Sequence, residues 1–128
     1  PYLGICIGYQ ILFDHSEEFE GADGLGILSG QVIRFPRNEL KVPHMGWNAI
    51  DMTDPGDPLW KDLPEKPYVY FVHSYYPNPT DDTVVSAWCD YGIRFAAAAR
   101  RGNLVATQFH PEKSQAIGLK ILQNFAGK

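Results

Sequence analysis

The sequence contains few cysteines and no long apolar runs. The 128 residues include two cysteines, Cys6 and Cys89, without the C-x-x-C spacing of a metal or redox site. This excludes a zinc site and a disulfide framework, so we expect no metal, two free thiols and a cytoplasmic location. No stretch approaches the roughly 20 apolar residues that a membrane-spanning helix needs.

Positive charge is not in excess either. Lys and Arg number 11 against 15 Asp and Glu, which gives a formal net charge of -4, and the basic residues are scattered. Neither nucleic acid nor an anionic membrane is therefore a predicted partner. With 45% hydrophobic residues, the chain has an ordinary globular composition and predicts one domain over residues 1–128.

The order of apolar segments predicts an α/β fold, with a central mixed sheet flanked by helices. Residues 2–7 read as a strand and residues 8 to about 19 as a helix, whereas residues 41–67 predict little regular structure except one helical turn near Leu59. Further strands are expected in "QVIRFP", "YVYFVHSYY", "TVVSAWC" and "RFAAAARRGNLVATQFH", the last folded as a hairpin. These strands are expected to form much of one sheet. A final amphipathic helix is predicted between Ser114 as N-cap and Gly127.

The segment "GICIG" places Cys6 between Gly4 and Gly8, where the strand passes into the helix. This is the arrangement of a nucleophile elbow, with cysteine in the central position. A helix N-terminus favours the thiolate, and the N–H of Ile7 is placed to face an oxyanion. From this stretch alone, Cys6 as a small buried hydrophobic residue remains an equal alternative.

A cysteine nucleophile needs a base, and His110 is the strongest of the four histidines. It ends the apolar run "LVATQF", and Glu112 lies two residues further on, so that both side chains project to one side of an extended segment. A carboxylate beside the imidazole selects one tautomer and stabilises the protonated ring. The alternative for His110 is a structural histidine at a strand end.

"GICIGYQ" resembles the nucleophile motif of the class I glutamine amidotransferases, G-x-C-x-G-x-Q, and "QFHPEKS" resembles their histidine and glutamate motif. Within that family, "GLGILSGQVIRF", "PHMGWN" and "YFVHSYY" look like the glutaminase subunits of imidazole glycerol phosphate synthase, in histidine biosynthesis. The resemblance covers essentially the whole chain. It implies the C-terminal portion of a flavodoxin-like fold and no cofactor.

The resemblance also implies a catalytic triad. Cys6 would attack the side-chain amide of glutamine, His110 would carry the proton from the thiol to the leaving ammonia, and Glu112 would orient His110. The glutamine pocket would be formed by Ile7, Gln10, Glu18, Ser74 and Tyr75. Glu18 on a solvated helix face and Tyr75 in the core remain alternatives from the residues alone.

In the resembling family, the "PHMGWN" segment borders a (β/α)8-barrel synthase subunit of the HisF type, which forms a heterodimer with the glutaminase and receives its ammonia through an internal passage. The candidate interface residues are Pro43, His44, Met45, Gly46, Trp47 and Asn48. From the residues alone, core or loop packing is the favoured interpretation of this segment, and only the resemblance shifts it toward a partner-facing loop. His15, His44 and His73 are expected to be mainly structural, and Cys89 to be packed or exposed without a catalytic role.

Two departures from the family pattern stand out. Ile7 and Tyr9 replace the more usual leucine and methionine beside the nucleophile. We also expect an N-terminal βαβ region, with its second oxyanion donor, to be missing from this chain. The alternatives are an amidotransferase for another synthase, such as the anthranilate or GMP type, and a non-catalytic fragment that only binds a partner.

Overall fold

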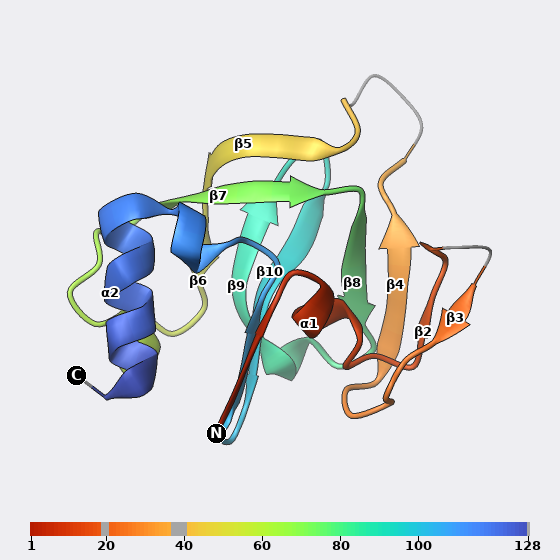
Figure 1. Cartoon of the computed structure of the whole chain (residues 1–128), viewed down its shortest axis with the longest axis horizontal. Coiled ribbons are helices and arrows are strands. Elements are labelled where there is room, and N and C mark those ends of the chain that lie inside the picture. Colours follow the sequence, from red (N-terminus) through yellow and green to blue (C-terminus); the bar gives the residue numbers. More distant parts are fainter. Residues whose placement is uncertain (19–20, 37–40, 128) are drawn as a thin grey trace.

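The computed structural model describes residues 1–18, 21–36 and 41–127, and the strands of this part form three sheets (Figure 1). The largest sheet has the strand order β1-β11-β10-β9-β6. These strands are β1 (Tyr2–Ile5), β11 (Leu104–Thr107), β10 (Arg94–Arg101), β9 (Val85–Asp90) and β6 (Asp51–Met52). β1 is parallel to β11, and the other pairs are antiparallel, which confirms the prediction of a mixed sheet.

The two smaller sheets are joined through Ser74. One has the order β3-β2-β4-β8, and the other pairs β5 with β7. Their strands are β2 (His15–Ser16), β3 (Ala22–Asp23), β4 (Gly30–Arg34), β8 (Tyr75–Pro79), β5 (His44–Ala49) and β7 (Tyr68–His73). Because the chain changes sheet between β7 and β8, the segment "YVYFVHSYY" supplies two strands and not one. The prediction that the later strands form much of one sheet therefore holds only for β9, β10 and β11.

The longest helix of the described part is α2 (Gln115–Ala126), which stands at the opposite end of the molecule from β2, β3 and β4 (Figure 1). It ends as predicted at Gly127, whose φ of 77° is the left-handed conformation typical of a helix C-terminus. Ser114 precedes the helix, but its hydroxyl makes no capping bond and instead donates to the carbonyl of His110 at 2.6 Å. The shorter helical elements are α1 (Ile7–Gln10), η2 (Pro58–Trp60), η3 (Asp82–Val84) and η4 (Pro111–Lys113).

A core of aromatic rings holds β7 against the largest sheet. Phe71 of β7 lies edge-on to Phe95 of β10 and to Phe109, with ring centroids 5.7 and 5.9 Å apart, and all three side chains are buried. Edge-to-face packing of this kind is favourable beyond the apolar area that it buries. The position of β7, which lies beside the candidate active site, is therefore set by the core.

Two predictions about local structure are wrong. The first helix ends at Gln10 and not near residue 19, which lies outside the described residues. Asp14 already lies outside the helix and pairs with a distant segment, since its backbone N–H donates to the carbonyl of Gly30 and its carboxylate accepts from the N–H of Gly30, both at 3.0 Å. The segment from His44 to Ala49 is a regular strand, because six of its residues pair with β7.

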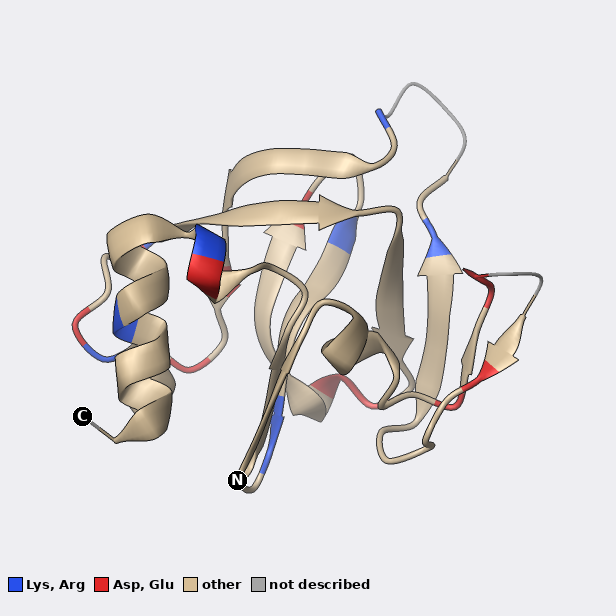
Figure 2. Ribbon diagram, viewed as in Figure 1, with Lys and Arg blue, Asp and Glu red and all other residues tan. Residues whose placement is uncertain are grey.

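Charged residues are distributed over several elements of the ribbon (Figure 2). Among the described residues, basic side chains lie on β4, β10, η4 and α2, and include Arg34, Arg94, Arg100, Lys113 and Lys120. None of the helices in this same part of the chain has the length and apolarity needed to span a membrane.

Candidate active site

Cys6 occupies a strained turn between β1 and α1. Its φ of 55° and ψ of -105° lie outside the regions that a residue with a side chain normally adopts. A Cβ atom on Gly4 would collide with the carbonyl oxygen of Gly8, so the strand and the helix can approach this closely only with glycine at position 4. Such strain is typical of functional sites, where the surrounding structure holds the residue in place.

His110 lies beside Glu112, as the spacing predicts. The Nδ1 atom of His110 is 2.8 Å from Oε2 of Glu112. The imidazole is mostly buried, with 16% of its side-chain surface exposed, whereas the Glu112 side chain is 47% exposed. Because the carboxylate accepts a hydrogen bond from Nδ1, the Nε2 atom of the neutral ring is left without a proton and is free to act as a base.

Strand pairing brings Cys6 and His110 to the same edge of the largest sheet. β1 and β11 are parallel neighbours with Ile5 opposite Thr107, and the N–H of Cys6 donates to the carbonyl of Thr107 at 2.8 Å. Both residues therefore follow the carboxyl ends of adjacent strands.

β7 lies along this edge. The N–H of His110 donates to the carbonyl of Tyr70 at 2.9 Å, and the Cys6 Sγ atom lies 4.0 Å from the carbonyl oxygen of Val72. Carbonyls two residues apart on a strand point to the same side. Cys6 and His110 thus contact the same side of β7, at carbonyls two residues apart.

Burial raises the pKa of the Cys6 thiol, and the nearby carboxylates of Glu112 and Glu18 raise it further. The backbone N–H of Ile7 and the side-chain amide of Gln108 lower this pKa, but burial has the larger effect. The expectation that the helix N-terminus favours the thiolate is therefore wrong in its net direction. α1 has only four residues, and the resting sulfur is a thiol that needs a base.

A cavity of about 180 Å³ opens beside the elbow. Three of the predicted pocket residues, Ile7, Gln10 and Glu18, line it. The other two, Ser74 and Tyr75, lie outside its lining at the junction of β7 and β8, although the Tyr75 carbonyl accepts a hydrogen bond from the side-chain amide of Gln10 at 3.0 Å. The cavity has room for a small molecule, and Glu18 gives it a negative charge.

The whole chain, residues 1–128, matches the family model described as "Glutamine amidotransferase class-I". The chain belongs to this family. It is 51% identical to imidazole glycerol phosphate synthase subunit HisH of Methylococcus capsulatus and 55% identical to that of Syntrophotalea carbinolica. These alignments cover 98% of this chain and 61% and 63% of the relatives, so the chain spans about 60% of the length of the curated relatives that it matches.

The solved structure of the glutaminase domain of CTPS from Trypanosoma brucei is also similar to this amidotransferase chain. It superimposes with a TM-score of 0.67 at 20% sequence identity, over 100% of this chain and 61% of that one. At this level of identity the likeness shows the fold alone. It confirms the prediction of a class I amidotransferase fold.

In this amidotransferase chain, the predicted interface segment is the edge strand β5 and not a loop. Its side chains alternate, so that Met45 and Trp47 are exposed, with 58% and 47% of their surface accessible, whereas His44 is buried. Pro43 precedes the strand, and Gly46 has a φ of 125°. Exposed large apolar side chains on an edge strand suit contact with another protein.

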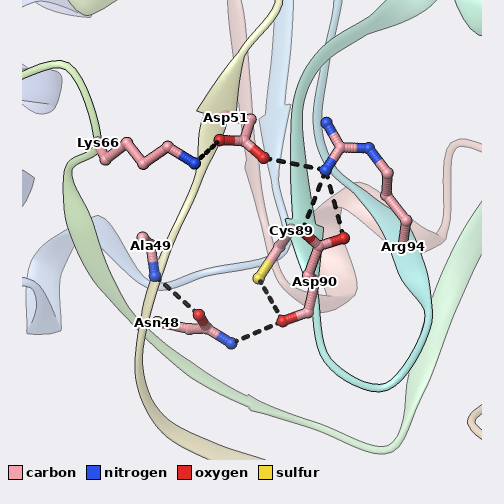
Figure 3. Close-up of polar contacts among 7 residues, drawn as sticks. All are labelled: Asn48, Ala49, Asp51, Lys66, Cys89, Asp90 and Arg94. Carbon is pink, nitrogen blue, oxygen red and sulfur yellow. Dashed lines mark hydrogen bonds and ion pairs between the residues drawn. The ribbon is translucent and has the colours of Figure 1, made fainter.

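The Asn48 side chain is hydrogen-bonded to the backbone of β9 and of its own strand (Figure 3). Its Nδ2 donates to the carbonyl of Asp90 at 3.1 Å, and its Oδ1 accepts from the N–H of Ala49 at 2.9 Å. Cys89 lies in the same region, is fully buried, and has its pKa raised to about 12, mainly by burial. Cys6 and Cys89 are both free thiols, as predicted.

Two features of the site were not predicted from the sequence. The first is a buried pair formed by His44 and His73, and the second is Gln108, which is fully buried and donates to the Cys6 sulfur. The available signal for Gln108 was a glutamine in the largely apolar run "LVATQF", two residues before the candidate base. Among the described residues, we find no cluster of His, Cys, Asp and Glu side chains suited to a metal ion.

Proposed function

We propose that this chain carries the catalytic part of a glutaminase, in which Cys6, His110 and Glu112 release ammonia from glutamine. The observation that carries the proposal is the strained elbow of Cys6 on the same side of β7 as the His110–Glu112 pair. A cavity beside the elbow would hold the substrate. Membership of the class I glutamine amidotransferase family supports the reaction type.

The first half of the reaction releases ammonia. His110 takes the thiol proton of Cys6 through Nε2, and the sulfur attacks the side-chain amide carbon of glutamine. The N–H of Ile7 faces the negative oxygen that forms, and the imidazolium is stabilised by Glu112. The C–N bond then breaks, and His110 returns its proton to the leaving nitrogen, which departs as ammonia.

The second half regenerates the enzyme. A water molecule gives a proton to His110 and attacks the carbonyl carbon of the thioester. The C–S bond breaks, glutamate is released, and the proton on His110 returns to the Cys6 sulfur. Since burial keeps the resting sulfur protonated, this sequence depends on His110 in both halves.

We further propose that the ammonia passes to a (β/α)8-barrel synthase subunit of the HisF type, which makes imidazole glycerol phosphate in the cytoplasm. The support is the identity of more than half of the aligned residues to proteins named imidazole glycerol phosphate synthase subunit HisH, together with the exposed Met45 and Trp47 on β5. Delivery inside a complex prevents the protonation of ammonia in water, which would remove its nucleophilic lone pair.

Covalent labelling tests the glutaminase proposal. The full-length protein, with its synthase partner present, is treated with an electrophilic glutamine analogue and mapped by mass spectrometry. We expect the label on Cys6, its loss in His110→Ala, and an unmodified Cys89 peptide as the internal control. No label on Cys6 in the complex would favour a non-catalytic, partner-binding role.

The choice of partner is tested separately. Synthase subunits of the imidazole glycerol phosphate, anthranilate and GMP types are each added to the protein, and glutamine turnover is measured. We expect stimulation by the first type alone. Stimulation by another type would assign the chain to a different amidotransferase pathway.

A further inference from the structure

Two buried glutamine side chains connect the backbone of β8 to the nucleophile. The Nε2 atom of Gln10 donates to the carbonyl of Tyr75 at 3.0 Å and to Oε1 of Gln108 at 3.1 Å. The Nε2 atom of Gln108 in turn lies 3.6 Å from the Sγ atom of Cys6, within the range for a hydrogen bond to sulfur. Gln108 is fully buried, and Gln10 is 7% exposed.

The backbone carbonyl of Tyr75 fixes the direction of both amides. A carbonyl oxygen only accepts hydrogen bonds, so the NH₂ group of Gln10 must face Tyr75. The second N–H of the same group then faces Gln108, which must present its oxygen. The NH₂ group of Gln108 therefore faces Cys6. If the Gln108 amide were flipped, its NH₂ group would face the NH₂ group of Gln10, and no donor would face the sulfur.

The Tyr75 carbonyl also accepts a hydrogen bond from a buried histidine. The Nδ1 atom of His73 is 2.9 Å from this oxygen and must donate to it, and Nε2 of His73 accepts from Nδ1 of His44 at 3.0 Å. The carbonyl therefore receives two hydrogen bonds, one from a buried imidazole and one from Gln10. Its position and the direction of the amide chain are fixed before any substrate binds.

We propose that Gln108 is a positioning residue for the nucleophile, which donates an N–H from a direction set by Tyr75 and Gln10 and thereby stabilises the Cys6 thiolate. This inference rests on the proposed glutaminase function, which makes Cys6 the nucleophile. A hydrogen bond to a charged acceptor is about twice as strong as one between neutral groups, so the N–H of Gln108 stabilises the thiolate more than the thiol.

The hydrogen bond from Gln108 matters because the Cys6 sulfur is partly buried. Burial and the carboxylates of Glu112 and Glu18 disfavour its negative charge, whereas Gln108 acts in the opposite direction. The arrangement also determines how Gln10 meets a substrate. Both N–H groups of Gln10 are used inside the protein, so its Oε1 atom is the group left to contact the cavity that it lines.

The pH dependence of Cys6 alkylation tests this inference without requiring glutamine turnover. Iodoacetamide reacts with the thiolate, and peptide mapping separates Cys6 from Cys89. In Gln108→Glu, the acceptor for Gln10 is kept, whereas the group that faces the sulfur loses its N–H and gains a carboxylate charge, and both changes disfavour the thiolate. We expect the alkylation midpoint of Cys6 to rise by about one pH unit, equivalent to a roughly tenfold loss of thiolate below the midpoint.

Gln123→Glu is the matched control, because it makes the same chemical change at an exposed position on α2. We expect its midpoint to equal that of the unaltered protein. An unchanged midpoint in a folded Gln108→Glu variant would overturn the inference. The glutaminase proposal has a separate readout, since labelling of Cys6 by the glutamine analogue in the unaltered protein does not depend on this shift.

A measurement on the unaltered protein covers the case in which Gln108→Glu does not fold. The side-chain amide of Gln108 is followed by ¹⁵N NMR across the pH range in which Cys6 ionises. We expect its proton resonances to move with the midpoint found by alkylation, and to move again when Cys6 is alkylated. Resonances that stay in place both when Cys6 ionises and when it is alkylated would contradict a hydrogen bond to the sulfur.

Discussion

His44 and His73 lie directly opposite each other on β5 and β7, and the Nδ1 atom of His44 is 3.0 Å from the Nε2 atom of His73. His44 is stacked between Phe71 and Tyr91, with ring centroids 4.7 and 3.9 Å away. Burial lowers the pKa of His44 to about 4 and that of His73 to about 3. Both rings are therefore neutral in the folded protein at neutral pH.

The pair makes the free energy of unfolding depend on pH. Because both folded-state pKa values lie below the ordinary 6.5, the unfolded chain takes up protons first as the pH falls. The stabilisation is complete above about pH 6.5 and is lost as the pH falls toward 4 and then 3. From His73 alone, we expect a loss of about 3 kcal/mol between pH 7 and pH 4, measured by urea unfolding.

His44→Asn is the comparison for this experiment. The asparagine amide replaces the Nδ1 donor but does not titrate, so the variant should lose less stability between pH 7 and pH 4 than the unaltered protein. An equal loss in both would contradict a contribution of His44 to the pH dependence and leave His73 as the histidine that carries it.

Gly4→Ala should damage the elbow, because the new Cβ would collide with the carbonyl of Gly8. We expect a loss of about 3 kcal/mol in the free energy of unfolding, since the contact is with backbone, which cannot move aside. Gly8→Ala provides the control. The new Cβ at position 8 would contact only the Tyr2 hydroxyl, at 3.7 Å. The free energy of unfolding of this variant should therefore change by less than about 1 kcal/mol. Equal losses in the two variants would mean that the strand and helix are not closely packed here.

Glu112→Gln should slow catalysis but make the Cys6 thiol easier to ionise. The neutral amide stabilises the His110 imidazolium less, so we expect glutamine turnover to fall about 100-fold, in kcat more than in KM. The Glu112 carboxylate also raises the pKa of Cys6, so its removal should lower the alkylation midpoint. Glu65→Gln, at an exposed position, should alter neither quantity. A loss of turnover with an unchanged midpoint would place Glu112 away from the sulfur.

Local patterns predicted the hairpin of β10 and β11, the final helix with its glycine stop, and the turn near Leu59. Each depends on residues that are close in the sequence. The strand at His44–Ala49 was missed because its pairing partner, β7, is distant in the sequence, with His73 opposite His44. α1 was predicted too long because apolar Ile11 and Leu12 continue the helical pattern, whereas Asp14 pairs with Gly30.

In the site too, contacts between residues close in the sequence were predicted, and contacts between distant segments were not. The contact between His110 and Glu112 follows from their spacing of two residues, and the elbow follows from its glycines. The chain from Tyr75 through Gln10 and Gln108 to the Cys6 sulfur joins three parts of the sequence. No local pattern shows that these side chains meet, and the opposing effect of burial on the thiol pKa is equally non-local.

The role of Cys6 as the nucleophile is tested by the glutamine turnover of Cys6→Ala and Cys89→Ala, each measured in the full-length protein with its synthase partner. We expect Cys6→Ala to lose more than about a thousandfold in kcat, whereas Cys89→Ala, which alters a fully buried thiol, keeps the turnover of the unaltered protein. Substantial turnover in a folded Cys6→Ala variant would contradict the assignment of Cys6 as the nucleophile.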